Sequence, residues 1–581
     1  MRRMPLGIQT FRKIVEGSYV YVDKTQYVYE LLYSASYYFL SRPRRFGKSL
    51  LLDTIGEAFS GDRELFKGLF LYDSGYSFEK HPVLRLDMSG IANETPEILK
   101  DSISTALRER ARDEDLELLG GVPSDLFRQL IKALHRKYGK GVVVLIDEYD
   151  KPILDHLVDL ETAEANRQVI KGFYGILKSM DRFLRMTFIT GVSKFTKTSI
   201  FSELNNLYDI TMTNEYSDIC GVDTEDLDKY FGEHIEHLST LDCFSHIRPK
   251  NANIRLANSV SPVLNPEFRV PDSDYTGEDR IRRIEGIRDG ILSWYDGYSW
   301  DGRTRLINPF SLLSFFMQKR FSSFWYSSGT PTFLIKLIKE KPSTFLSLGE
   351  LELSERSLDT FEISKIDIVP LLFQTGYLTV EERRFRGDSV NYLLRMPNLE
   401  VREAFYMNIL AEFTERGGQL TETAYWRIKD SLEAGDLGNI VSVLKSLFAS
   451  IPYQLHISRE AYYHSIFIAL MRVLGFEMDA EVSTSTGRID AVLELGDKVY
   501  IMELKYIDCA PDAAPEEKRA IFDKALDEGM RQIEDRGYAR RFEGSGKTVY
   551  KAALAFLGRD DIEMRVERDV LTDDALTASS P

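Results

Sequence analysis

Residues 37–52, YYFLSRPRRFGKSLLL, join a short aromatic run to a basic turn and then to the start of an apolar helix. A strand that leads through a loop into a helix presents free helix-start amides to an anion. The turn ends in Gly47-Lys48-Ser49, the second half of the G-x-x-x-x-G-K-S pattern, in which lysine reaches the terminal phosphates and serine holds Mg²⁺. Arg42 replaces the first glycine of that pattern, so this loop has to turn without the freedom of glycine at positive φ.

A second motif, an apolar run that ends in acids, strengthens this interpretation. Residues 142–148, VVVLIDE, suit a central parallel strand covered by helices on both faces. Alone, the run would be explained more simply as a buried strand with an acidic exit. After the phosphate motif, Asp147 is expected to hold the metal through water and Glu148 to polarise the attacking water. The next apolar strand ends near Thr190 and Ser193, which we expect to sense the γ-phosphate of ATP.

The turn also carries Arg44 and Arg45, and the chain is locally basic from its start to Lys48. We expect the two arginines to clamp the phosphates, or one of them to complete hydrolysis; the sequence does not single out that arginine. The basic start indicates an anionic partner near this end, and a solvated basic face explains it equally well.

Helices and strands alternate along the N-terminal part of the chain, as in an α/β fold. Periodicity predicts strands at residues 83–88, 142–146 and 186–190, and helices at residues 94–119, 123–138 and 161–182. Further along, residues 371–397, LLFQTGYLTVEERRFRGDSVNYLLRMP, predict a β-hairpin within a helical, winged-helix-like region.

A different pattern lies near the C-terminus, where Asp490 is followed by AVLELGDKVYIM and then by Glu503-Leu504-Lys505. Side chains alternate along a strand, so Glu503 and Lys505 share one face, and Asp490 starts the adjoining strand. Two carboxylates can bind Mg²⁺, and a nearby lysine can orient or deprotonate water, which is the chemistry of phosphodiester hydrolysis. An ordinary hairpin with charged outward residues would explain a bare match. Here, however, the motif lies inside a helix–hairpin–strand–helix sequence.

The helices that flank this hairpin add candidate catalytic residues. Glu460 and His464 lie one turn apart on the preceding helix, and Gln532 lies on the following one. A lone histidine such as His464 is more often structural than functional.

The composition is that of a folded globular protein, with 43% hydrophobic and 28% charged residues. A chain of 581 residues exceeds one hydrophobic core, so roughly two to four domains are expected. The net charge of −16 does not exclude nucleic-acid binding, because a local positive groove is sufficient. Cys220, Cys243 and Cys509 show no metal or disulfide spacing, and no signal peptide or membrane span is recognisable. We therefore expect a cytoplasmic protein without a membrane partner.

The motifs together resemble a family of bacterial proteins in which an AAA-ATPase-like domain precedes a PD-(D/E)XK nuclease superfamily domain. The resemblance runs from end to end of the chain. It is carried by the phrases RPRRFGKSLLL, VVVLIDEYDKPIL, FITGVSKFTKTSIFSELNNL, WYDGYSW with Asn308-Pro309, WYSSGTPTFLIKL and GRIDAVLELGDKVYIMELKY.

This resemblance implies roles for particular residues. The family shares the missing first glycine, so Arg42 need not inactivate the loop, and ATP and Mg²⁺ are the implied cofactors. The nuclease motif carries over onto Asp490, Glu503, Lys505 and Gln532. Related Holliday-junction-resolvase-like nucleases have a glutamate where this chain has His464, and Glu460 could substitute for it from the previous turn.

We thus expect an α/β protein in five parts. They are a P-loop AAA-like ATPase domain (1–215), a helical insertion or lid (216–300), a helical, winged-helix-like region (301–455), a restriction-endonuclease-like nuclease domain (456–567) and a flexible tail (568–581).

The leading hypothesis is an ATP-hydrolysing protein with an Mg²⁺-dependent nuclease that cleaves nucleic acid, with DNA the expected substrate. A nucleotide-switched interaction protein with a non-catalytic, nucleic-acid-binding nuclease-like domain is the alternative, and a small-molecule phosphotransferase is a third. AAA relatives often assemble into rings, but no arginine that acts across subunits is recognisable here.

Overall fold

The computed structural model describes most of the chain. The described residues are 1–194, 200, 204, 206–244, 277–325, 351–358, 368–387, 389–413, 418–449, 470–471, 477–479, 489–495, 497–507, 514–537, 539, 542, 545–557 and 561–570. The chain divides into two compact units. Unit 1 comprises residues 1–241, 291–320 and 351–398, and unit 2 comprises residues 242–290, 321–350 and 399–581. The five-part division expected from sequence stays a prediction.

The centre of unit 1 is a parallel sheet of five strands in the order β2-β3-β4-β1-β5. Its strands are β1 (Tyr37–Ser41), β2 (Val83–Asp87), β3 (Val142–Asp147), β4 (Leu184–Gly191) and β5 (Tyr208–Asp209). The three strands expected at 83–88, 142–146 and 186–190 are confirmed. The first five residues of β3 are fully buried, as a central strand covered on both faces requires.

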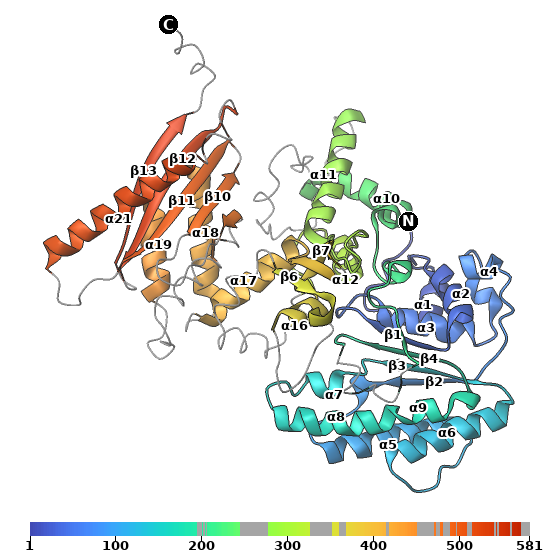
Figure 1. Ribbon diagram of the computed structural model, residues 1–581. Coiled ribbons are helices and arrows are strands. Elements are labelled where there is room, and N and C mark those ends of the chain that lie inside the picture. The colour runs from blue at the N-terminus through green and yellow to red at the C-terminus, as the bar shows by residue number, and fades with distance from the viewer. Residues whose placement is uncertain are drawn as a thin grey trace. The chain divides into compact units, whose positions relative to one another are not determined.

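Helices cover both faces of this sheet (Figure 1), with α1 to α3 on one side and α5, α6 and α8 on the other. The helices are α1 (Phe11–Glu16), α2 (Thr25–Ser34), α3 (Lys48–Ala58), α4 (Phe70–Asp73), α5 (Pro96–Asp113), α6 (Pro123–Tyr138), α7 (Lys151–Leu154), α8 (Leu160–Tyr174), α9 (Ile176–Ser179) and α10 (Thr224–Ser239). The α6 helix shows why the sequence predicts them: proline opens it, Gly139 ends it at positive φ, and its apolar residues recur on one buried face.

Unit 1 also contains a smaller antiparallel sheet in the order β6-β8-β7. The elements of this part are α12 (Pro309–Gln318), β6 (Leu351–Ser354), α15 (Glu355–Leu358), α16 (Ile368–Thr375), β7 (Thr379–Arg386) and β8 (Ser389–Arg395). Helix α11 (Gly277–Tyr295) belongs to unit 2 as far as residue 290 and to unit 1 from residue 291. The β-hairpin expected within residues 371–397 is confirmed as β7 and β8.

Unit 2 has a mixed sheet in the order β13-β12-β11-β10-β9, in which β11 and β12 are parallel and the other neighbours antiparallel. Its elements are α17 (Leu399–Phe413), α18 (Gly418–Ala434), α19 (Gly438–Ala449), β9 (Glu477–Asp479), β10 (Ile489–Leu495), β11 (Lys498–Ile507), α21 (Pro515–Arg536), β12 (Thr548–Leu557) and β13 (Asp561–Val570). Two parallel neighbours need a crossover, and α21 provides it between β11 and β12.

The two faces of this second sheet pack against different helices (Figure 1). Phe522, Leu526 and Met530 of α21 form a core with Val499 and Ile501 of β11. On the opposite face, the Tyr500 hydroxyl donates a hydrogen bond to the carbonyl of Leu432 at the end of α18. Side chains repeat with period two, so the odd-numbered residues of β11 lie on the face that α21 covers. None of the helices in the described ranges is long and apolar enough to cross a membrane.

Candidate functional site

The turn between β1 and α3 has the backbone form of an anion-binding loop. Gly47 directly precedes α3 with φ 92° and ψ 8°, and a Cβ there would meet no atom within 4 Å. Positive φ, rather than crowding, therefore explains glycine at this position. Because β1, β3 and β4 are parallel, the loop and the carboxyl ends of β3 and β4 share one edge of the sheet, where α/β folds bind ligands.

Lys48 begins α3 beneath this loop, and Ser49, the candidate Mg²⁺ ligand, follows it half-buried. The Lys48 side chain is 6% exposed, and its Nζ donates to the carbonyl oxygens of Arg42 and Pro43, each at 2.9 Å. Burial lowers the pKa of Lys48, whereas Asp147 and Glu148 act in the opposite direction. The loop thus holds a cation close enough to the acid pair for their charges to interact.

The acids at the end of β3 are tied to the neighbouring strand. The hydroxyl of Thr190, fully buried on β4, donates to Asp147 Oδ1 at 2.6 Å, and the same oxygen accepts the amide of Glu148 at 3.0 Å. Glu148 has φ 49°, which is uncommon for a residue with a side chain. Burial raises the pKa of Glu148, and Lys48 opposes that shift. The structure therefore brings together Lys48, Asp147, Glu148 and Thr190, and their roles toward ATP and Mg²⁺ stay predictions.

A third acid, Asp150, was not predicted and organises the loop after β4. It is 1% exposed and accepts hydrogen bonds from the amides of Val192 and Ser193 and from the Ser193 hydroxyl, the last at 2.5 Å. Burial raises the pKa of Asp150, and these bonds oppose the shift. The hydroxyl of Ser193 is thus already engaged, and its role as a γ-phosphate sensor stays a prediction. In the sequence, Asp150 is visible as the third acid of the phrase IDEYD, two residues after Glu148, and this was the signal that could have pointed to it.

Arg42, at the position of the missing glycine, points into the protein. Its side chain is fully buried, and its two terminal nitrogens donate to four backbone carbonyls, those of Ser41, Thr211, Tyr216 and Ser217. The guanidinium also lies 4.0 Å from the centre of the Trp300 ring. Burial lowers the pKa of Arg42 to about 10, so the group stays charged at neutral pH. In this chain the loop is fixed by a buried cation where the usual pattern has a flexible glycine.

Arg44 and Arg45 occupy the solvent side of the same turn, and both are exposed. The Arg45 guanidinium lies 4.8 Å from the centre of the Phe310 ring. Burial raises the pKa of Glu148, and the charge of Arg44 is one of the weaker effects that oppose this rise. These two arginines are therefore placed differently from Arg42 and are accessible to a bound anion.

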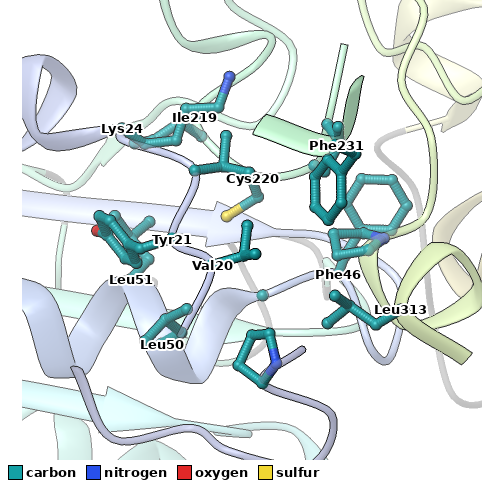
Figure 2. Close-up of a pocket in the computed structure, with 16 residues that line it drawn as sticks. Val20, Tyr21, Lys24, Phe46, Leu50, Leu51, Ile219, Cys220, Phe231 and Leu313 are labelled. Atoms are coloured by element: carbon teal, nitrogen blue, oxygen red, sulfur yellow. The ribbon is translucent and has the colours of Figure 1, made fainter. Parts of the chain in front are cut away.

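An apolar pocket of about 110 Å³, partly open to solvent, borders Gly47 (Figure 2). Figure 2 shows Val20 and Tyr21 on one side, Phe46 and Phe231 on another, and the Cys220 sulfur pointing between them. Residues distant in sequence form this wall together, so sequence reasoning did not find it. The position at the start of α3 suits a group attached to phosphates held by the loop.

In unit 2, Glu503 and Lys505 of the predicted nuclease motif lie on the face of the sheet that α21 covers. Glu503 is 1% exposed, and its Oε1 lies 3.2 Å from Lys505 Nζ but accepts no hydrogen bond from the described residues. Asp490 of β10 is the register partner of Glu503, and Asp479 of β9 is the register partner of Asp490. Three carboxylate-bearing positions thus form one row across neighbouring strands.

Helix α21 completes this site from above the sheet. Gln532 Oε1 accepts a hydrogen bond from Lys505 Nζ at 2.5 Å, as expected for the predicted glutamine, and Glu528, one turn earlier, has an oxygen 4.0 Å from the same Nζ. Between them, a Cβ on Gly529 would lie 2.8 Å from the Ala553 side chain and 3.7 Å from Glu503. Glycine is therefore what lets the helix approach this closely. Sequence reasoning missed Glu528, although its spacing of four from Gln532 was visible.

The donor set of this site fits a hard divalent cation. Carboxylate oxygens are the ligands that Mg²⁺ prefers, and among the described residues none donates a hydrogen bond to the buried Glu503 Oε1. Glu460 and His464, the candidates for a further ligand, lie outside the described residues.

Comparison with known proteins identifies two domains in the chain. Residues 5–201 match a family model described as a predicted AAA-ATPase, and residues 458–565 match one described as the PD-(D/E)XK nuclease superfamily. The chain belongs to the family of proteins that join these two domains. An uncharacterised protein encoded in the vnfD 5' region of Azotobacter chroococcum mcd 1 is 34% identical over 562 residues, which cover 96% of each chain.

Proposed function

We propose that unit 1 binds and hydrolyses ATP and that unit 2 is an Mg²⁺-dependent nuclease that cleaves nucleic acid, with DNA as its substrate. The observation that carries the nuclease proposal is the Glu503 carboxylate, which is buried beside Lys505 and has one oxygen that accepts no hydrogen bond within the described part of the chain. A buried, incompletely satisfied carboxylate is costly, and such groups concentrate at functional sites.

In unit 1, the oxygens of phosphates bound at the loop would accept hydrogen bonds from the helix-start amides of α3, from the Lys48 ammonium and from the exposed Arg44. Ser49 and Asp147 would hold Mg²⁺, which supplies charge neutralisation of the phosphates when bound. Glu148 is placed to orient water, and Thr190 keeps the Asp147 carboxylate in position through its hydrogen bond.

The apolar pocket beside Gly47 is the proposed site of the adenine base. Its lining is largely apolar, and the rings of Tyr21 and Phe46 offer surfaces for stacking. A base there would be joined through its ribose to phosphates on the adjoining loop. Oligomerisation stays a prediction.

In unit 2, Asp490 and Glu503 would hold Mg²⁺, which when bound supplies Lewis-acid polarisation of the phosphodiester. Lys505 would orient the attacking water and carry or accept a proton at Nζ. Gln532 fixes that ammonium group on the side of α21 through its hydrogen bond. The residues would act as one unit, so the loss of any one should abolish cleavage.

Plasmid nicking tests this function. Wild-type protein should nick supercoiled DNA with Mg²⁺ and not with EDTA. Asp490→Asn, Glu503→Gln and Lys505→Met should each reduce the rate at least about 1,000-fold. Glu567→Gln, the same chemical change at an exposed position of β13, should not alter it.

Two outcomes would reject the nuclease assignment. One is cleavage that persists in EDTA. The other is cleavage that Glu503→Gln leaves intact. Metal-dependent DNA binding without nicking would instead favour the alternative of a non-catalytic, nucleotide-switched binding protein.

A further inference from the structure

The β7–β8 hairpin of unit 1 ends in an exposed aromatic residue surrounded by arginines. Phe385 is 70% exposed, and the guanidinium of Arg383 lies 5.3 Å from the centre of its ring. Arg384 and Arg386 complete the tip on β7. The core does not require an exposed phenylalanine, and cationic and aromatic side chains together are typical of surfaces that bind nucleic acid.

The base of the same hairpin is firmly anchored. Thr379 and Val380 are buried, the Val380 amide donates to the Ser299 carbonyl at 3.1 Å, and the Ser299 amide donates to Thr379 Oγ1 at 2.6 Å. Arg305 adds a hydrogen bond to the Val380 carbonyl at 2.9 Å. A rigid base with an exposed tip is the arrangement expected of a ribbon that inserts into a partner.

The ion pairs at the tip are of the exchangeable kind. Arg386 contacts Glu352 at 2.6 Å, and Arg384 contacts Glu382 at 2.8 Å and Glu352 at 3.7 Å. The arginine of each pair is 41% or 66% exposed, whereas Glu352 is 20% exposed, and pairs that water reaches contribute little to stability because water screens them. They hold the guanidinium groups in place and can be replaced by phosphate oxygens at small cost, which gives bidentate, charge-assisted hydrogen bonds.

We propose that the β7–β8 hairpin is a duplex-DNA contact, in which Arg383 and Arg386 bind phosphates and Phe385 enters the groove against the bases. A two-stranded β-ribbon fits the major groove of B-form DNA, whereas the major groove of an RNA duplex is too narrow. An apolar ring at the tip can contact thymine methyl groups. The inference rests on the proposed function only in taking nucleic acid as the partner.

The test measures binding of the full chain to a labelled 30-base-pair DNA duplex by fluorescence anisotropy in EDTA, where no metal-dependent cleavage occurs. The double variant Arg383→Glu/Arg386→Glu should bind at least 10-fold more weakly. It should also reduce the slope of log Kd against log salt by about 2, since two phosphate contacts are lost. Phe385→Ala should weaken binding several-fold and leave the slope unchanged.

The matched control is Arg108→Glu/Arg112→Glu, an identical charge change at two exposed positions of α5. It should bind DNA as the wild type does. A hairpin double variant that binds as tightly as this control would overturn the proposal and leave the proposed function standing. Loss of affinity for an RNA duplex but not for DNA would overturn the choice of DNA. A wild type that binds neither duplex would reject both the hairpin contact and nucleic acid as the partner.

Discussion

Arg42→Ala should destabilise unit 1 before any nucleotide is added. The wild-type guanidinium is fully buried and donates to four backbone carbonyls at 2.8 to 3.4 Å, and it stacks on Trp300. The substitution removes these charge-assisted bonds and opens a cavity beside the indole.

The size of the effect follows from these contacts. A hydrogen bond to a charged group contributes about 1.5–3 kcal/mol, but four of them are offset in part by the desolvation of a buried cation. Truncating a large buried side chain to alanine typically costs about 2–5 kcal/mol. We therefore expect the free energy of unfolding of unit 1 to fall by about 3–5 kcal/mol.

The assay is urea and thermal unfolding of nucleotide-free protein, monitored by circular dichroism. The transitions of the two units are analysed separately, because a chain of two units need not unfold in one step. Arg44→Ala is the control, because Arg44 is exposed on the same turn. It should leave unfolding within about 0.5 kcal/mol of wild type and weaken ATP binding. Arg42→Ala curves that superimpose on wild type, together with lost ATP affinity, would refute this reasoning and make Arg42 a phosphate ligand.

Three further predictions concern the two sites. Lys48→Ala should weaken ATP binding by about 3 kcal/mol, roughly 100-fold, through loss of a charged phosphate contact, and equal affinities in a fluorescent-ATP titration would remove the assignment. Glu148→Gln should bind ATP without turning it over. Because burial raises the pKa of Glu148, wild-type ATPase activity should decline with falling pH already above the usual glutamate range, and a flat profile down to that range would contradict this. Gly529→Ala should lower the free energy of unfolding by about 1–3 kcal/mol and slow nicking, because the added Cβ would lie 2.8 Å from the Ala553 side chain. An unchanged melting temperature and an unchanged nicking rate would show that α21 can shift to make room for the methyl group.

Local sequence patterns predict much of the fold. The apolar run 142–146, the proline-to-glycine span of α6 and the alternation of Glu503 with Lys505 are short-range features, because backbone geometry repeats every two or 3.6 residues. The sequence alone therefore predicted the alternating α/β order, the β7–β8 hairpin and the helix after the nuclease strands. Most candidate site residues could also be chosen from their spacing in the sequence, because the members of each motif, such as Gly47 and Lys48, lie close together along the chain.

Only the tertiary structure decided which of these elements became neighbours. The insertion of β4 between β1 and β3 places the Thr190 hydroxyl against Asp147, and no local pattern encodes strand order. In the sequence, Arg42 is recognisable only as the residue that replaces the first glycine of the phosphate-binding pattern. Its partners Thr211 and Trp300 lie far along the chain, so its structural role emerges only on folding. The pocket beside Gly47 also forms only on folding, because its lining residues come from distant positions in the chain. The burial and charge around each group depend on such neighbours.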